Sequence, residues 1–217
     1  MNITSKFTSL IAFILLSLPL MANASLIDFT DSSWSNAITN GTGTTATVGN
    51  ITLTASNGSL TFNDSDSERS GCLAGQTSHG LACAGDGIGI GNDEITESGT
   101  HFNTSDQTIT ISFASAVDIS NVSLLDLFGN ENSGEIAVID GLLFGPPVGN
   151  LGISGGYYAT GFTKQNALSI VLQGNIDNFS DFSLAALNIE VSPVPLPGAL
   201  LLFGSALLGL FGFKRFS

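Results

Sequence analysis

Between residues 25 and 191, apolar residues alternate with Thr, Ser and other small polar residues at a period of two. The alternation is clearest in Ile51–Ala55, Ser59–Phe62 and Thr108–Phe113, and such a pattern is typical of strands with one buried face. Similar runs occupy residues 122–128, 135–139, 157–162, 168–172 and 182–191. No run of ten residues in this region shows a helical period, so strands alone are expected.

Short turn signals separate these runs, among them Gly129–Gly134 and Gly145-Pro-Pro147. Roughly eight to ten short strands separated by such turns are typical of an antiparallel sandwich. We therefore predict an all-β chain with a single antiparallel β-sandwich domain over residues 25–191, jelly-roll-like in its organisation. No internal repeat and no second domain are evident in the pattern.

The N-terminal segment has a different pattern. Lys6 precedes a nearly unbroken apolar run over residues 10–21, and Ala22-Asn-Ala24 follows it. A positive charge, a short apolar core and an A-x-A site are typical of a secretory signal peptide, and the core is shorter than the ~20 residues that span a bilayer. We expect a signal peptide over residues 1–24 that is cleaved after Ala24, so that Ser25 begins the exported chain. An uncleaved N-terminal anchor is the alternative.

The C-terminal segment also has a membrane pattern. Residues 196–213 carry no charge, and two basic residues follow them. The three prolines of residues 192–198 prevent a regular helix or strand there, so we predict a Pro-rich joint, then a transmembrane helix over residues 199–213 and a basic cytoplasmic tail over residues 214–217. Basic residues favour the cytoplasmic side of a membrane, which leaves the β domain on the outer side.

The tail has three parts in a fixed order, namely a Pro-rich motif, an apolar run and a basic pair: Val194, Pro195, Leu196, Pro197 and Gly198, then residues 199–213, then Lys214 and Arg215. This order resembles the PEP-CTERM sorting domain in its VPLPA variant, over residues 193–216 only. Gly198 stands where the variant has Ala, and Leu196 stands where the type motif has Glu. A generic C-terminal anchor is the alternative.

The resemblance implies a partner and a route. Proteins with this tail are thought to be substrates of an exosortase, a multi-pass membrane protease-transpeptidase, and many accompany exopolysaccharide and biofilm production. We therefore expect export through the inner membrane, transient anchoring by the C-terminal helix, and a final location at the cell surface or outside the cell.

The charge of the chain is concentrated in the predicted domain. The formal net charge is −13 although the mean hydropathy is +0.36. All 18 acidic residues lie between Ser25 and Glu190, where Arg69 and Lys164 are the only basic residues, so this region has a formal charge of −16. Nucleic acid is excluded as a partner because phosphate contact requires clustered Lys and Arg. The apolar content of 43% argues against intrinsic disorder.

The two cysteines, Cys72 and Cys83, both lie in the exported region. An even count in an oxidising compartment predicts a disulfide. A zinc site formed by Cys72, His79 and Cys83 is the alternative, although its spacing matches no familiar cluster and a fourth ligand is missing.

Acidic residues gather between residues 63 and 97, where alternate oxygen ligands could converge on one hard cation such as calcium. The candidate calcium ligands are Asp64, Asp66, Asp86 and Asp93. As an EF-hand the segment fails, because Arg69 and Gly75 occupy the positions that require Gly and Glu. A solvated acidic loop without metal is the other interpretation.

No catalytic set emerges from the sequence. Gly152-Ile-Ser154-Gly-Gly156 matches a nucleophile elbow as a string, but an elbow needs a following helix and a later His, and both histidines, His79 and His101, precede Ser154. Gly87–Gly91 imitates a dinucleotide fingerprint with a misplaced third Gly. The first string indicates a Gly-rich turn, and the second is rejected because no βαβ unit is present.

The leading hypothesis is therefore a non-enzymatic, exported β-sandwich protein of the cell surface or matrix. A calcium-assisted carbohydrate-binding module is the alternative, with Trp34, Tyr157 and Tyr158 as the aromatic residues that could stack on sugars. A secreted glycosidase or lyase is a third class, for which the sequence does not say which two carboxylates would form the pair.

Overall fold

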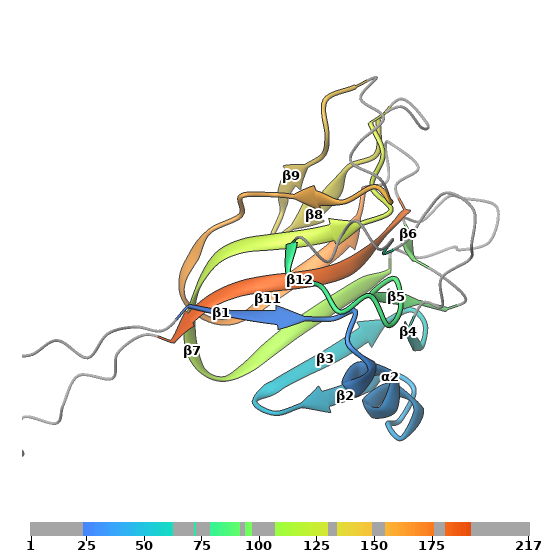
Figure 1. Ribbon diagram of the computed structural model, residues 1–217, viewed down its shortest axis with the longest axis vertical. Helices are drawn as coiled ribbons and strands as arrows, with labels where there is room; N and C mark the ends of the chain where they lie inside the picture. Colours follow the sequence, from blue (N-terminus) through green and yellow to red (C-terminus); the bar gives the residue numbers. More distant parts are fainter. Residues whose placement is uncertain are drawn as a thin grey trace, which may run out of the picture. The chain divides into compact units, whose positions relative to one another are not determined.

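The computed structural model describes residues 24–62, 72, 79–91, 94–96, 107–129, 134–148, 155–175 and 181–191. These residues form antiparallel strands and one short helix (Figure 1). The elements, in chain order, are β1 Ala24–Asp28, α2 Ser32–Thr39, β2 Thr45–Val48, β3 Ile51–Ser56, β4 Leu60–Phe62, β5 Ile88–Ile90, β6 Ile95–Thr96, β7 Thr108–Leu125, β8 Ala137–Ile139, β9 Leu142–Phe144, β10 Tyr158–Ala159, β11 Lys164–Gly174 and β12 Asp181–Val191. The predicted all-β class is confirmed.

The strands form a curled antiparallel sheet whose main path is β4-β5-β12-β7-β11-β8-β9. The first half of β7 pairs with β3 on one side and with β11 on the other. The second half pairs with β12 on one side and with β10 and the start of β11 on the other. Because β7 exchanges neighbours along its length, the sheet bends around one interior (Figure 1).

The long strand β7 corrects the prediction of two separate strands at residues 108–113 and 122–128. Buried and partly buried residues alternate strictly up to Phe113, the residues Ala114-Ser-Ala116 interrupt the alternation, and buried positions resume at Val117. The pairing with β11 shifts register across this interruption, between Ala167 and Ser169, as at a β-bulge, and the strand continues through it. The result is one continuous strand of 18 residues.

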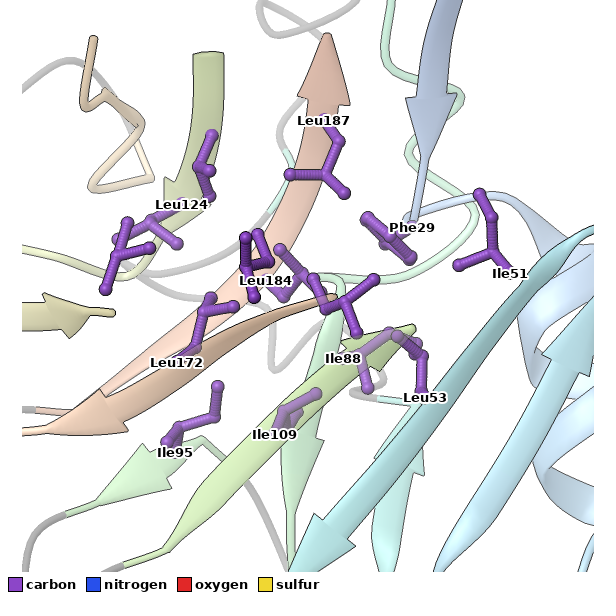
Figure 2. Packing of buried hydrophobic residues seen from close by; sticks show 14 of the residues in the cluster. Phe29, Ile51, Leu53, Ile88, Ile95, Ile109, Leu124, Leu172, Leu184 and Leu187 are labelled. Carbon is purple, nitrogen blue, oxygen red and sulfur yellow. The ribbon is translucent and has the colours of Figure 1, made fainter. Parts of the chain in front are cut away.

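The core lies on the inner face of this curled sheet. Figure 2 shows apolar side chains from several strands directed into the same interior, among them Phe29, Ile51, Leu53, Ile88, Ile95, Ile109, Leu124, Leu172, Leu184 and Leu187. Burial of each such side chain contributes about 1.5–3 kcal/mol relative to exposure, so the period-two pattern decides which face of each strand points inward.

The helix α2 was not expected from the sequence. Asp31 caps it, because the Asp31 Oδ1 accepts a hydrogen bond of 2.8 Å from the Ser33 backbone N–H. Only Trp34 of the helix is fully buried, and its ring lies 4.9 Å from that of Phe29. Trp34, Ala37 and Ile38 stand at a helical spacing and pack against the core, but a helix of 8 residues is too short to show a helical period over a run of ten residues.

The first and last described strands pair with each other. β1 runs antiparallel to β12 with Ala24 opposite Glu190 and Asp28 opposite Ala186, and the two strands lie side by side in Figure 1. The described domain therefore begins and ends at the same end of one strand pair.

Candidate functional site

A groove of about 440 Å³ opens between α2, β1, the β2–β3 turn and the bend of β7. Trp34 holds the helix against the core, and the turn at Gly49 forms the opposite wall. The floor is apolar and is formed by Ile27, Val48, Ile51, Phe113, Val117 and Ile189. Polar atoms at the rim come from Asp28, Asp31, Ser33, Asn50 and Ser115. An apolar floor with a few polar groups is the usual composition of a small-ligand site, and the volume is within the usual range of such sites.

The two carboxylates at the rim already have structural partners. Asp28 Oδ1 accepts hydrogen bonds from the Thr30 backbone N–H at 2.9 Å and from the Thr30 hydroxyl at 2.6 Å. Asp28 Oδ2 accepts one from the Ala82 backbone N–H. The Ser33 hydroxyl, followed by the Ser33 backbone N–H, lowers the pKa of Asp31 below its ordinary value of 3.8. The groove therefore presents a stable negative rim that can accept hydrogen bonds from a ligand.

The sequence did not single out this groove. Its rim residues come from a helix start and from strand ends that are far apart in the chain. The one local signal is Asp31 followed by Ser32-Ser33, which is an N-cap pattern. The groove itself could not be found from a pattern in one segment.

A second hollow of about 440 Å³ is lined by polar residues where β7 and β11 meet. Lys164 lies in it and forms an ion pair of 2.7 Å with Asp140, while Asp118 Oδ1 accepts a hydrogen bond of 2.7 Å from the Asn166 backbone N–H. Glu190 completes the negative side of the hollow. Lys164 is thus engaged by Asp140 and Asp118 by the backbone, so this hollow is mainly a structural junction of the two strands.

The predicted disulfide between Cys72 and Cys83 is confirmed, with 5.1 Å between the two Cα atoms. Because the bond joins both sulfur atoms, the alternative zinc site with His79 is wrong. The disulfide segment contacts the turn that follows β1, since the Cys83 N–H donates to the Thr30 hydroxyl at 3.0 Å and the Ala84 N–H donates to the Thr30 carbonyl at 3.0 Å.

Of the four candidate calcium ligands, only Asp86 belongs to the described residues. It is 8% exposed, and its Oδ1 accepts a hydrogen bond of 2.6 Å from the Cys72 backbone N–H. Asp64, Asp66 and Asp93 lie outside the described residues. Within the part of the chain that the structure describes, no three His, Cys, Asp or Glu side chains are grouped so that they could hold a metal ion. Through this hydrogen bond, Asp86 holds the backbone of the disulfide-bonded Cys72 in place.

The aromatic candidates for sugar contact have different surroundings. Trp34 is 2% exposed and belongs to the core, so its ring is not available on the surface to stack on a sugar. Tyr157 stacks on His79 with ring centroids 4.2 Å apart and an angle of 12° between the planes, and its hydroxyl lies 3.1 Å from the Ser123 hydroxyl. Tyr158 is partly buried against the core. The Tyr157–His79 pair covers the small cluster around the disulfide.

The two glycine-rich strings have structural roles where they are described. The strand β10 follows Gly155-Gly156, whereas a nucleophile elbow requires a helix at this point. A Cβ on Gly156 would lie 2.6 Å from the Leu127 backbone nitrogen, so a close backbone approach requires this glycine. Residues 88–90 of the other string form the buried strand β5. Ser154 and His101 lie outside the described residues.

The predicted export and sorting segments flank the described domain. Ala24 and Ser25 are the first residues of β1. The motif Val194–Gly198, the predicted membrane helix over residues 199–213 and the pair Lys214-Arg215 lie outside the described residues. Among the residues that are described, no helix has the length and apolar character needed to cross a membrane.

Comparison of the chain with models of protein families, with curated proteins and with solved structures gave no match.

Proposed function

We propose that this chain is an exported, non-enzymatic protein of the cell surface or extracellular matrix, delivered by a PEP-CTERM/exosortase-type system. Its β domain is the passenger, and we propose that the curled sheet is a jelly-roll-like β-sandwich. The exchange of neighbours along β7 supports this fold, because strands that bend from one layer into the next close such sandwiches.

One observation carries the proposal, namely the order of Pro-rich motif, apolar run and basic pair in residues 193–216. The pairing of β1 with β12 is compatible with it. Ala24 lies opposite Glu190, so the described domain starts beside the place where it ends. The proposed signal cleavage after Ala24 and the Pro-rich joint at residues 192–198 border these two strand ends. A domain whose two ends are adjacent can be attached to the membrane through its N-terminal or its C-terminal segment without a change in its fold.

Cleavage at the proposed site is compatible with the strand. β1 pairs residue by residue from Ala24 to Asp28 with β12, and loss of Ala24 would remove only the terminal pair. Ser25, opposite Ile189, would then begin both the mature chain and the strand. The domain therefore retains β1 after processing.

The proposed roles in the tail follow the order of its parts. Val194, Pro195, Leu196, Pro197 and Gly198 are the residues that the exosortase recognises. The helix over residues 199–213 holds the precursor in the inner membrane, and Lys214 and Arg215 keep its end on the cytoplasmic side. Cleavage near the joint releases or transfers the domain.

Mass spectrometry of the protein recovered from its native host tests this proposal. We expect an N-terminus at Ser25 and a C-terminus near residues 192–198. The double variant Pro195→Ala, Pro197→Ala should accumulate with its tail intact, whereas Phe216→Ala, outside the motif, should be processed normally. Recovery of a peptide that extends to Ser217 in the final wild-type product would contradict the proposal.

The groove favours a second candidate function, a carbohydrate-binding module. Hydroxyl-rich ligands suit a site that has an apolar floor and the acceptor groups of Asp28, Asp31 and Ser33 at its rim. A glycan array with and without a calcium chelator tests this function and its calcium dependence. Ser33→Trp, which adds a large side chain to the lining of the groove, should abolish any signal, and Leu168→Trp, at an exposed position of β11, is the matched control. An array without signal would leave only the surface or matrix role.

A further inference from the structure

The sheet ends in an open edge at β9. Among the described residues, β9 pairs only with β8, and the two strands lie at the margin of the sheet in Figure 1. The hairpin is pinned, because the Asp140 backbone N–H donates to the Val171 carbonyl at 2.9 Å and the Val171 N–H donates to Asp140 Oδ1 at 2.9 Å. A pinned strand with one unpaired side is a template for a further strand.

The register of the hairpin identifies the backbone groups that face outward. Ile139 lies opposite Leu142, and the turn between them has two residues with positive φ, 49° at Asp140 and 80° at Gly141. In such a turn the flanking residues hydrogen-bond to each other, and the bonding direction alternates along the strand. The N–H and C=O of Leu143 therefore face away from β8.

The apolar surface of the described domain is concentrated at this edge. Five large apolar side chains are exposed in the described residues, and three of them, Leu142, Leu143 and Val148, lie in β9 or shortly after it. Leu143 is 63% exposed and Val148 is 80% exposed. Leu142 and Leu143 are consecutive in β9 and therefore point to opposite faces of the sheet, so both faces beside the open edge are apolar, which favours association.

The charge distribution favours a second copy of this chain as the occupant. A chain with a net charge of −13 repels its own copies wherever carboxylates meet. Residues 141–148 carry no charge, and the Asp140 carboxylate beside them is paired with Lys164 at 2.7 Å. This edge is therefore a place where two acidic copies can approach with little repulsion.

We propose that β9 is a self-association surface, at which two copies of the chain pair antiparallel about a two-fold axis at Leu143. Leu143 then lies opposite Leu143 of the second copy, Leu142 lies opposite Phe144, and Asp140 lies opposite Pro146. No like charges face each other in this register. The contact is isologous and therefore closes as a dimer, and it joins two sheets across one ladder.

The strand is short, and the contact is therefore weak. With three residues in each strand, the interface is at the lower end of the size range for specific association, and we expect a dissociation constant on the order of 10⁻⁴ M. The inference does not depend on the proposed export route, because it concerns the purified chain.

Cysteine cross-linking of the full chain in detergent tests the proposal. A hydrogen-bonded antiparallel pair has its Cα atoms about 5.5 Å apart, within the range of a disulfide. Leu143→Cys should therefore form a covalent dimer under mild oxidation at least tenfold faster than Leu168→Cys, which replaces a side chain of matched exposure, 62% against 63%. Leu142→Cys, which this register places opposite Phe144 of the second copy, should form the covalent dimer more slowly than Leu143→Cys. Both native cysteines are joined to each other, so the introduced thiol is the reporter.

Sedimentation of the same preparations gives an independent measurement. Leu143→Lys should raise the dissociation constant of the dimer at least tenfold, whereas Leu168→Lys should change it less than twofold. Equal cross-linking of Leu143→Cys and Leu168→Cys would overturn the proposal, because it would show unspecific adhesion or contact through the tail. A wild-type chain that remains monomeric at millimolar concentration would also overturn it.

Discussion

The covered margins of the sheet and its open margin at β9 differ in sequence and in construction. On the outer side of β4, the Leu60 N–H donates a hydrogen bond of 2.6 Å to the Gly43 carbonyl, which belongs to the segment of residues 41–45. The helix α2 lies beside β2 and β4. The disulfide segment lies at the C-terminal end of β1, where Asp28 and the following Thr30 accept its hydrogen bonds. At β9, no comparable cover exists among the described residues.

At the covered margins, the unpaired side of the last strand is protected by a helix or a loop and not by a further strand. An unpaired edge risks unwanted pairing, and proteins commonly blunt it with a helix, a loop or charge. This chain uses a helix at one margin and a disulfide-bonded loop at another. At the open margin, Leu142 and Leu143 are exposed and the charge of Asp140 is paired with that of Lys164. This composition is typical of a contact surface. Substitutions should therefore affect stability at the covered margins and association at the open one.

The largest effect is expected for Trp34→Ala. Its side chain is 2% exposed and anchors α2 against Phe29, so its removal leaves a cavity and detaches the cover from β2 and β4. We expect a loss of about 3–5 kcal/mol in the free energy of unfolding, measured by denaturant titration. A loss below about 1 kcal/mol would mean that the helix does not stabilise this margin.

The cover of β1 depends on the disulfide. Replacement of both Cys72 and Cys83 by Ser should lower the free energy of unfolding by about 3 kcal/mol, because the unfolded chain regains the entropy of an open loop. Reduction of the wild-type protein should have the same effect, and a reductant should not affect the double variant. Equal stability of the two proteins in thermal melts would contradict this role.

A smaller effect is expected at the helix cap. Asp31→Ala removes the acceptor for the Ser33 N–H and should cost about 1 kcal/mol. Because the folded-state pKa of Asp31 is lowered from 3.8, its ionic contribution is present above pH 3.8 and is lost as the pH falls through the folded-state value. Asp31→Asn retains the acceptor and should lose only this acid dependence. Melts between pH 2 and pH 6, at roughly one-unit steps, would show whether the two variants separate in this way.

The smallest effect on folding is expected at the open margin. Leu143→Lys should change the free energy of unfolding by less than about 0.5 kcal/mol, as is usual for exposed positions. Leu168→Lys, of the same exposure, is the control. If Leu143→Lys alone destabilised the monomer by more than about 1 kcal/mol, the exposed leucine would be part of the fold and the contrast between the margins would fail.

The sequence predicted several strands with good bounds because their alternation is local. The run Ile51–Ala55 and the run of residues 182–191 each match a strand, β3 and β12, to within one residue. The strands β1, β2, β5, β6 and β9 were not predicted, since they are short or lack a clear period. The disulfide was predictable because Cys72 and Cys83 are the only cysteines of the chain. The groove was not, because its walls come from four separate segments.

By itself, the sequence determined the β class, the buried face of the main strands and the pairing of the two cysteines. A period of two decides which side chains point inward, and it says nothing about which strand lies alongside. Only the tertiary structure decided that β7 is continuous, that α2 and the disulfide segment cover two margins, and that Leu143 lies on an open one. The physical reason is that strand neighbours are joined by hydrogen bonds between backbones, which are the same for every sequence and are selected by the packing of the whole domain.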